Sequence, residues 1–336
     1  MSIFLRHIFI ALLLIIAKIN YSQPMQAPYE KIIVSGLHDS LSYYFVQDYR
    51  LYTERWDTLA QPKFWRYVMK LSPDSGVLNI ASNRKMIATY STKQWNSLPD
   101  SIKSRIRDSI SNEWCLAPDE KIYFTEGKGH YYDYKNAIPT ISRGIEIFEK
   151  NNTDPFYAQV ILLIESPGKS ARSNAGALGS FQLMKGVAKN MGLRVDKYVD
   201  ERKDFDRSAY AAAKLIRTIC IPYADSIVKK YGIEYNPTDL WFRLLVLHIY
   251  HAGAYNVAKA VDVIQPCEGN MELIKQLWQT KAGGFGNASQ NYTQIALASL
   301  FELNDIIYNN CTDLIVDAVN SSAMLSSEDN ENDNIK

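Results

Sequence analysis

The chain has 336 residues, of which 47% are hydrophobic, so it can bury one large core or two smaller ones. Its 37 lysines and arginines nearly balance its 36 aspartates and glutamates, which argues against a polycation that neutralises nucleic-acid phosphates. The composition therefore excludes a wholly disordered protein, and we expect no nucleic-acid partner.

The first residues have the pattern of an export signal. Arg6 and His7 precede an apolar run over residues 8–17, which is short for a membrane span but fits the apolar part of a signal peptide. We expect residues 1–22 to be this signal, cut after Ser22, and no other stretch to span a membrane. A short uncleaved anchor is the alternative.

The cysteines are too few and too scattered for a disulfide miniprotein or a zinc ribbon. If the protein is exported they can pair, but four cysteines allow three pairings, and buried free thiols remain an alternative. The four are Cys115, Cys220, Cys267 and Cys311.

Residues 23–140 predict a mostly helical N-terminal region with minor β structure. From about residue 38 apolar side chains recur at steps of three and four, which predicts a helix, and a turn follows at residues 72–76. Isoleucines four apart predict a second helix over residues 102–110, and residues 121–126 alternate as a short strand does. The apolar side chains of the first helix are Leu41, Phe45, Tyr49, Tyr52 and Trp56. We find no recognisable chemistry in this accessory region.

Residues 141–310 are strongly helical in pattern, and the tail at 311–336 becomes rich in Ser, Asn, Asp and Glu. Such a tail cannot bury enough apolar surface to offset its ordering entropy, so we predict disorder there.

The most informative helix starts at Asp154 and Pro155, an N-cap followed by a proline at the first helical position. Apolar residues at 157, 160, 161 and 164 define its buried stripe, and Glu165 falls on or beside that stripe. Desolvation of a carboxyl favours its neutral form and raises its pKa, as a general acid near neutral pH requires. A glutamate that points to water at a fraying helix end is the alternative interpretation.

A glycine-rich loop follows this helix. Gly176 and Gly179 allow tight turns of the backbone, and after them come the amide of Gln182 and the flexible thioether of Met184. By itself a pair of glycines three apart is weak evidence for a site.

Four ordered blocks between about 150 and 305 together resemble the soluble lytic transglycosylase (SLT) domain of peptidoglycan-cleaving enzymes. They are Glu165-Ser166 with Gly176-Ala177, Gly179, Gln182 and Met184; Asp200-Glu-Arg-Lys-Asp204; Ile249-Tyr-His-Ala-Gly253; and Gln290-Asn-Tyr292. The second block is most similar to the membrane-bound lytic transglycosylase D branch.

The chain departs from the family pattern at several positions. His251 stands where the family usually has asparagine, Ala254-Tyr255 replaces the customary Pro-Gly, and the acidic residue before the late tyrosine is missing near Ala288. These departures concern residues that would contact substrate at the far end of the groove, whereas Glu165 matches the family pattern.

The resemblance implies a mainly α protein, with a lysozyme-like all-α catalytic domain at 141–310 behind the accessory region. It implies an exported enzyme of the periplasm or cell envelope that acts on glycan strands of peptidoglycan. Glu165 would protonate the bond between N-acetylmuramic acid and N-acetylglucosamine, then act as base while a 1,6-anhydro ring closes. Substrate assistance makes a second carboxylate unnecessary.

The resemblance also assigns residues to the groove. Tyr250 would lie within hydrogen-bond reach of Glu165 and help to orient it, and the lining would comprise Ser166, Ser173, Gln182, Met184 and Tyr292. Alternatively, Met184 and Tyr250 belong to the core, Ser173 is a turn residue or cap, and His251 is a structural imidazole rather than a proton carrier.

No metal or cofactor is expected, because His248-x-x-His251 lacks an adjacent Glu or Cys ligand pattern. Two alternative functions stay open: a hydrolytic muramidase on the same fold, and a non-catalytic peptidoglycan-binding module of envelope assembly. Protein partners, and endolytic against exolytic cutting, are not indicated by the residues.

Overall fold

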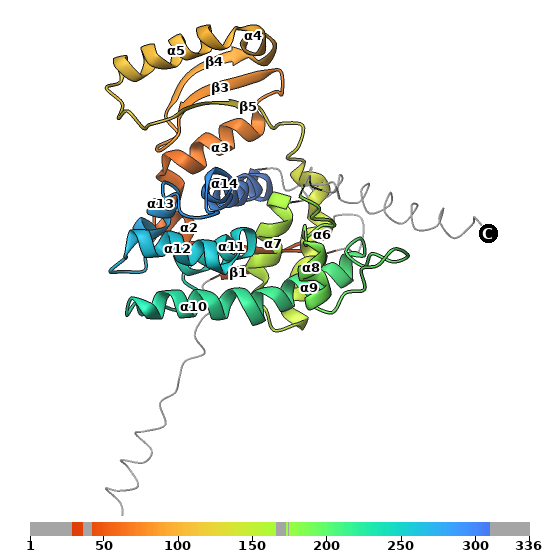
Figure 1. Ribbon diagram of the computed structural model, residues 1–336. Coiled ribbons are helices and arrows are strands. Elements are labelled where there is room, and N and C mark those ends of the chain that lie inside the picture. The colour runs from red at the N-terminus through yellow and green to blue at the C-terminus, as the bar shows by residue number, and fades with distance from the viewer. Residues whose placement is uncertain (1–28, 36–41, 166–172, 174, 310–336) are drawn as a thin grey trace, which may run out of the picture.

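The computed structural model describes residues 29–35, 42–165, 173 and 175–309. A small lobe of strands and two helices stands above a larger body of packed helices (Figure 1). The predicted mainly α, lysozyme-like fold is confirmed, and the β-strands described all lie before residue 127. Among the described residues no helix combines the length and the apolar character needed to cross a membrane.

The N-terminal region has two longer helices, α3 and α5, and otherwise short helical segments. They are α2 (Arg50–Thr53), a 3-10 turn at Trp56–Thr58, α3 (Ala60–Lys70), α4 (Thr92–Ser97) and α5 (Asp100–Glu113). The larger body continues with α6 (Tyr134–Lys150), α7 (Pro155–Glu165), α8 (Lys185–Asn190), α9 (Phe205–Leu215), a π-helical turn at Ile216–Cys220, α10 (Ile221–Lys230), α11 (Leu240–Ala252), α12 (Ala254–Ile264), α13 (Met271–Leu277) and α14 (Asn287–Asn309).

The helix predicted from about residue 38 is wrong in its first half. Strands β1 (Tyr29–Ser35) and β2 (Ser42–Asp48) form an antiparallel hairpin, and helix begins only at Arg50. On its other edge β2 is held by side chains: Gln159 exchanges two hydrogen bonds with the backbone of Val46, at 2.7 and 2.8 Å. Hydrogen bonds from a distant helix therefore stabilise the extended backbone of β2. The spacing of apolar residues within one segment cannot predict such distant partners.

The upper lobe is an antiparallel sheet in the order β4-β3-β5, made of β3 (Ser75–Ile80), β4 (Met86–Ser91) and β5 (Ile122–Glu126). The predicted strand at 121–126 and the predicted helix around 102–110 are both confirmed. Helices α4 and α5 supply Trp95 and Ile110 to a second, small core with residues of the sheet. The ring of Trp95 stacks on Phe124 at 4.9 Å between centroids.

Arg84 joins this lobe to the larger body. It is 4% exposed, and its guanidinium donates to Asn79 in β3 at 3.0 Å and to Asn291 in α14. The ring of Trp65 lies 5.7 Å from the same guanidinium. Burial lowers the pKa of Arg84 to about 10, so the group keeps its charge at neutral pH.

Helix α7 is the centre of the larger body. Its side chains from Pro155 to Ile164 are all buried, whereas the sequence predicted a single buried stripe. Helix α6, helix α14 and strand β2 pack around it, and a helix that is apolar on all sides is buried on all sides.

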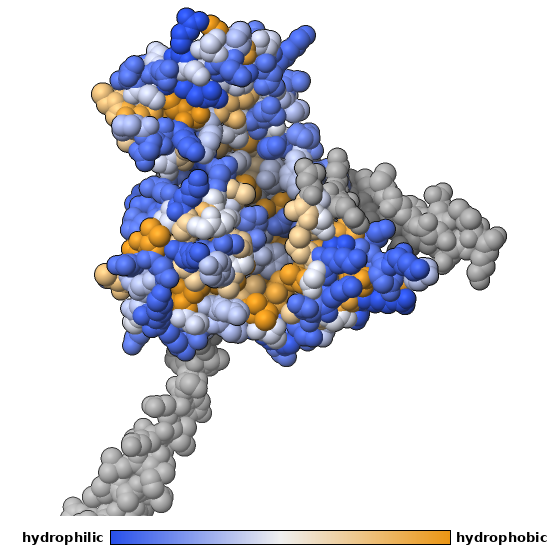
Figure 2. Space-filling view, in the orientation of Figure 1, coloured by the Kyte–Doolittle hydropathy of each residue, from blue (hydrophilic) through white to orange (hydrophobic). Residues whose placement is uncertain are grey.

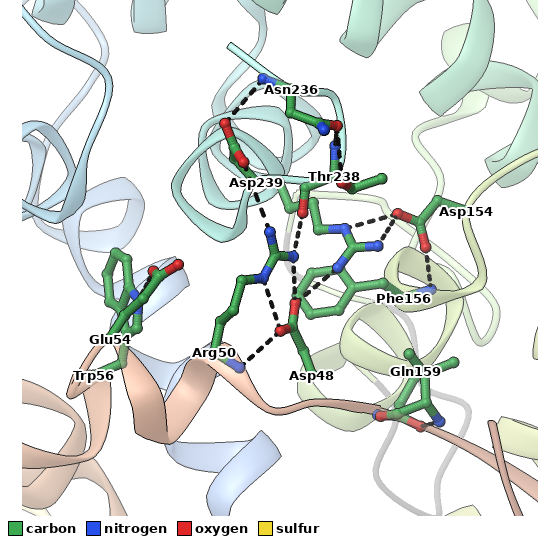
Figure 3. A network of polar contacts seen from close by, with 12 residues as sticks. Asp48, Arg50, Glu54, Trp56, Asp154, Phe156, Gln159, Asn236, Thr238 and Asp239 are labelled. Carbon is green, nitrogen blue, oxygen red and sulfur yellow. Dashed lines mark hydrogen bonds and ion pairs between the residues drawn. The ribbon is translucent and has the colours of Figure 1, made fainter. Parts of the chain in front are cut away.

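A buried ionic network connects the hairpin, α7 and α11. Arg243 in α11 is fully buried and pairs with Asp48 at 2.9 Å and with Asp154 at 2.6 Å. Asp48 also accepts from Arg50, and Phe156 lies under the Arg243 guanidinium at 4.8 Å (Figure 3). The predicted cap is confirmed, since Asp154 accepts the Phe156 amide at 3.0 Å. One side chain thus caps α7 and ties it to its neighbours.

Cys115 and Cys267 are exposed free thiols, and Cys220 is a buried one whose pKa is raised by burial to about 12. Cys311, the predicted signal at 1–22 and the predicted disordered tail at 311–336 lie outside the described residues.

Candidate active site

Glu165 is the last residue of α7, at the point where this buried helix reaches the surface. Ile164 before it is buried, whereas Glu165 is partly exposed. The space-filling view shows apolar side chains gathered in the hollow between the upper lobe and the helices below it (Figure 2). A carboxyl at this helix end is shielded by protein while part of it stays open to solvent.

Burial raises the pKa of Glu165 from its ordinary 4.5 to about 7. The hydroxyl of Tyr292 in α14 donates to Glu165 Oε1 at 2.9 Å. That hydrogen bond favours the charged form and acts against the effect of burial, but it is the smaller of the two. Near neutral pH the carboxyl can therefore both give and take a proton.

Four tyrosines from three parts of the chain surround this carboxyl. Tyr292 comes from α14, Tyr250 from α11, and Tyr131 and Tyr132 from the segment before α6. The pKa of each phenol is raised, first by burial and further by the negative charge of Glu165. The four tyrosines contribute to the burial of Glu165, and their raised pKa values keep the phenols neutral near pH 7.

Tyr250 lies near enough to Glu165 for the carboxyl charge to raise its pKa, but the hydrogen bond that its hydroxyl donates goes to another group, so its predicted role in orienting Glu165 stays a prediction. The Tyr250 hydroxyl donates to the carbonyl oxygen of Phe181 at 2.5 Å, so its single proton is directed to the glycine-rich loop. Tyr292, predicted only to line the groove, is the tyrosine that bonds the carboxyl. The hydrogen bond to the Glu165 carboxyl therefore comes from Tyr292 of α14.

The glycine-rich loop is held in place by Arg202. Its guanidinium is 3% exposed, pairs with Asp200 at 2.7 Å and donates to the carbonyl oxygens of Gly176 and Leu183 at 2.9 and 3.0 Å. Gly179 has a φ of +82°, and a Cβ there would lie 1.8 Å from the Arg202 carbonyl oxygen. The Asp-x-Arg-x-Asp block therefore positions the loop, and its Asp204 caps α9 by accepting the Arg207 amide at 2.8 Å.

Gln182, Met184 and Ser173 differ in what surrounds them. The Gln182 amide donates to the Gly179 carbonyl at 2.9 Å, within its own turn. Met184 is 44% exposed and is not part of the core, while Ser173 is exposed and its hydroxyl accepts the Ala177 amide at 3.0 Å in a turn. Their contacts with a ligand stay predictions, and Ser166 lies outside the described residues.

His251 lies beside the carboxyl's tyrosine partner. Its imidazole stacks on the ring of Tyr292 with centroids 4.3 Å apart, and burial lowers its pKa although part of the residue is exposed. A neutral imidazole at the surface of the site can hydrogen-bond a neutral sugar group.

His248, one turn earlier, is a structural imidazole. It is fully buried, and its Nε2 lies 2.8 Å from the Thr293 hydroxyl, which accepts from Trp278 Nε1 at 2.8 Å. Burial, the largest cause, lowers the pKa of His248 to about 3, so it stays neutral. In the described part of the chain no three His, Cys, Asp or Glu residues are grouped so that they could hold a metal ion.

Tyr131 and Tyr132 were missed by the sequence analysis. They belong to the accessory region, and no motif marks them, since two tyrosines after a Gly-Lys-Gly turn have no spacing typical of a site. Only the packing of residues 127–133 against α7 brings them to Glu165.

Residues 145–264 match the family model described as the transglycosylase SLT domain. The match supports assignment of this part of the chain to the SLT family and indicates lytic transglycosylase family activity on peptidoglycan. It includes Glu165, Tyr250 and the glycine-rich loop, whereas Tyr131 and Tyr292 lie outside it. No curated protein matches the chain.

Proposed function

We propose that the protein is an exported peptidoglycan lytic transglycosylase in which Glu165 acts first as acid and then as base. The observation that carries this proposal is a single carboxyl with a pKa of about 7 at the open end of a buried helix, bonded by Tyr292. A placement in the membrane-bound lytic transglycosylase D branch, and in the periplasm or cell envelope, is part of the proposal.

In the first step protonated Glu165 gives its proton to the glycosidic oxygen between N-acetylmuramic acid and N-acetylglucosamine. The bond from this oxygen to the muramic acid C1 breaks, and the leaving sugar departs with a new hydroxyl. The substrate's acetamido group stabilises C1 as positive charge develops there. Because burial raises the pKa of Glu165 to about 7, a large fraction of the protein carries the protonated carboxyl at neutral pH.

In the second step the Glu165 carboxylate takes the proton from the C6 hydroxyl of the same muramic acid. The freed O6 attacks C1 and closes the 1,6-anhydro ring, so no water is consumed and Glu165 is protonated again. The Tyr292 hydroxyl stabilises the carboxylate between the two steps. Intramolecular attack benefits from a nucleophile already held in place.

The surroundings of Glu165 favour this route over hydrolysis. The titratable groups of the described chain that face it are the phenols of Tyr131, Tyr132, Tyr250 and Tyr292, with the His251 imidazole behind Tyr292. All are neutral near pH 7, and none provides a carboxylate to activate a water. In this proposal Ser166, Ser173, Gln182, Met184 and His251 contact the glycan.

Product analysis tests the reaction class. Purified protein incubated with sacculi is expected to release muropeptides that end in 1,6-anhydromuramic acid, each lighter by one water than the hydrolytic product. Mass spectrometry of the soluble fragments distinguishes the two. Reducing ends in place of anhydro ends would identify a muramidase instead, and binding to sacculi without fragments would identify a non-catalytic module.

The pH dependence follows from the raised pKa of Glu165. Catalysis starts from the protonated carboxyl, so kcat/KM is expected to fall as the pH rises above about 7, the pKa of Glu165. Initial rates on soluble glycan strands, measured from about pH 5 to about pH 9, show where kcat/KM falls on the alkaline side of the pH profile. A rate that keeps rising above pH 8 would contradict the assignment of Glu165 as acid.

A further inference from the structure

The segment between β5 and α6, residues 127–133, is tied firmly to the N-terminal region. The amides of Gly127, Lys128 and Gly129 donate to the carbonyls of Ser75, Val68 and Leu71 at 2.8 to 3.0 Å. A Cβ on Gly127 would lie 2.2 Å from the Ser72 carbonyl oxygen, so the two backbones pack in direct contact. Helix α3 and strand β3 therefore determine where this segment lies.

From this segment Tyr131 reaches the end of α7. Its hydroxyl lies 3.0 Å from the carbonyl oxygen of Glu165 and 3.3 Å from that of Ile164, and it donates to this pair. Carbonyls in the last turn of a helix have no amide partner within the helix and carry partial negative charge. Tyr131 thus supplies an external donor to the turn that carries the carboxyl.

The Tyr131 ring lies on the open side of the site. It is 39% exposed, and it meets Tyr132 edge to face at 4.9 Å between centroids. Beyond them Tyr134 bonds Ser299 of α14 at 3.0 Å. The tyrosines therefore form a wall between α7 and α14, with Tyr131 as its outermost member.

We propose that Tyr131 is a positioning residue for Glu165, supplied by the accessory region, which holds the last turn of α7 and shields the carboxyl from water. This proposal rests on the proposed function. It gives the accessory region a part in the reaction, because the segment that carries Tyr131 is located by β3 and α3.

Two effects of Tyr131 can be separated by two substitutions. Tyr131→Ala removes the ring, admits water to Glu165 and stabilises its charged form, so the pKa of Glu165 falls. Tyr131→Phe keeps the ring but loses the hydrogen bonds to the two carbonyls, which loosens the turn without exposing the carboxyl. The remaining groups that face Glu165, namely Tyr132, Tyr250, Tyr292 and the nearby His251, are unchanged in both variants.

The experiment measures the pKa of Glu165 directly and through activity. In full-length protein labelled with ¹³C at the glutamate carboxyls, the Glu165 signal is identified by its loss in Glu165→Gln, and it is titrated by NMR. Tyr131→Ala is expected to lower this pKa by about one unit and to move the alkaline limb of kcat/KM to lower pH by the same amount. Tyr131→Phe is expected to keep the pKa and to lose roughly threefold to tenfold in kcat.

Two controls bracket these results. Tyr223→Ala removes a 52% exposed tyrosine of α10 and should change neither the pKa nor the rate. Tyr292→Phe removes the hydrogen bond that lowers the pKa of Glu165, so it should shift the titration to higher pH, opposite to Tyr131→Ala.

The outcomes separate the two proposals. An unchanged Glu165 titration in a folded Tyr131→Ala variant overturns the role of Tyr131, whatever the enzyme's product. If the wild type releases no anhydro-muropeptides, the proposed function fails, and the NMR titration still decides whether Tyr131 shields Glu165. Circular dichroism checks that each variant is folded.

Discussion

Replacing Glu165 with glutamine is expected to lower the release of anhydro-muropeptides from sacculi by ~100-fold to 10,000-fold. Glutamine keeps the size of the side chain and can accept the Tyr292 hydrogen bond, but it can neither give nor retrieve a proton. Because one group serves both steps, nothing else in the site compensates for its loss. Quantifying anhydro ends by mass spectrometry measures the effect.

A matched control and a stability measurement accompany this variant. Glu146→Gln changes an exposed glutamate of α6 whose ion pair with Lys150 spans 3.8 Å, and its activity should equal that of the wild type. In the folded wild type the pKa of Glu165 is about 7, against an ordinary 4.5. The free energy of unfolding of the wild type, relative to that of Glu165→Gln, is therefore expected to fall as the pH rises from about 4.5 to about 7. Full activity of a folded Glu165→Gln protein would disprove the assignment.

Replacing Arg243 with methionine is expected to reduce the free energy of unfolding by about 3–5 kcal/mol. Arg243 is fully buried between Asp48 and Asp154, and its removal leaves Asp48, itself 1% exposed, with Arg50 as its remaining cation. The same change breaks the connection between the N-terminal hairpin, α7 and α11. Chemical denaturation followed by circular dichroism measures the loss.

An exposed pair provides the comparison for Arg243. Arg194 and Asp196 form an ion pair of 2.7 Å whose side chains are 60% and 39% exposed. Arg194→Met is expected to leave the free energy of unfolding nearly unchanged, because solvent screens such exposed pairs. Equal losses in the two variants would show that the buried network contributes no more than a surface contact.

Local signals in the chain were sufficient to predict α7. Asp154 and Pro155 mark the start of the helix, the apolar run marks its burial, and Glu165 stands at its end. Capping and periodicity act over a few residues, so they can be predicted from those residues alone.

Strand β2 was missed because its partners are far away in sequence. Phe45 in this strand belongs to the apolar series at helical spacing that runs from Leu41 to Trp56. However, β1 pairs with one edge of the strand, and Gln159 and Ser142 bond its other side. Backbone hydrogen bonds gained from such distant groups outweigh a weak local preference for helix.

A carboxyl at the end of an apolar helix, followed by a glycine-rich turn, was readable from residue types and spacing, whereas its role as an acid was implied by the resemblance to the SLT family. The surroundings of Glu165 could be seen only in the folded chain. The fold decides which tyrosine bonds the carboxyl, and it places Tyr131 and Tyr132 from the accessory region beside it. Desolvation depends on everything packed around a group in three dimensions, and 127 residues separate Glu165 from the tyrosine that bonds it. The raised pKa of Glu165 is therefore a property of the fold, whereas the presence of a carboxyl at the end of α7 is a property of the sequence.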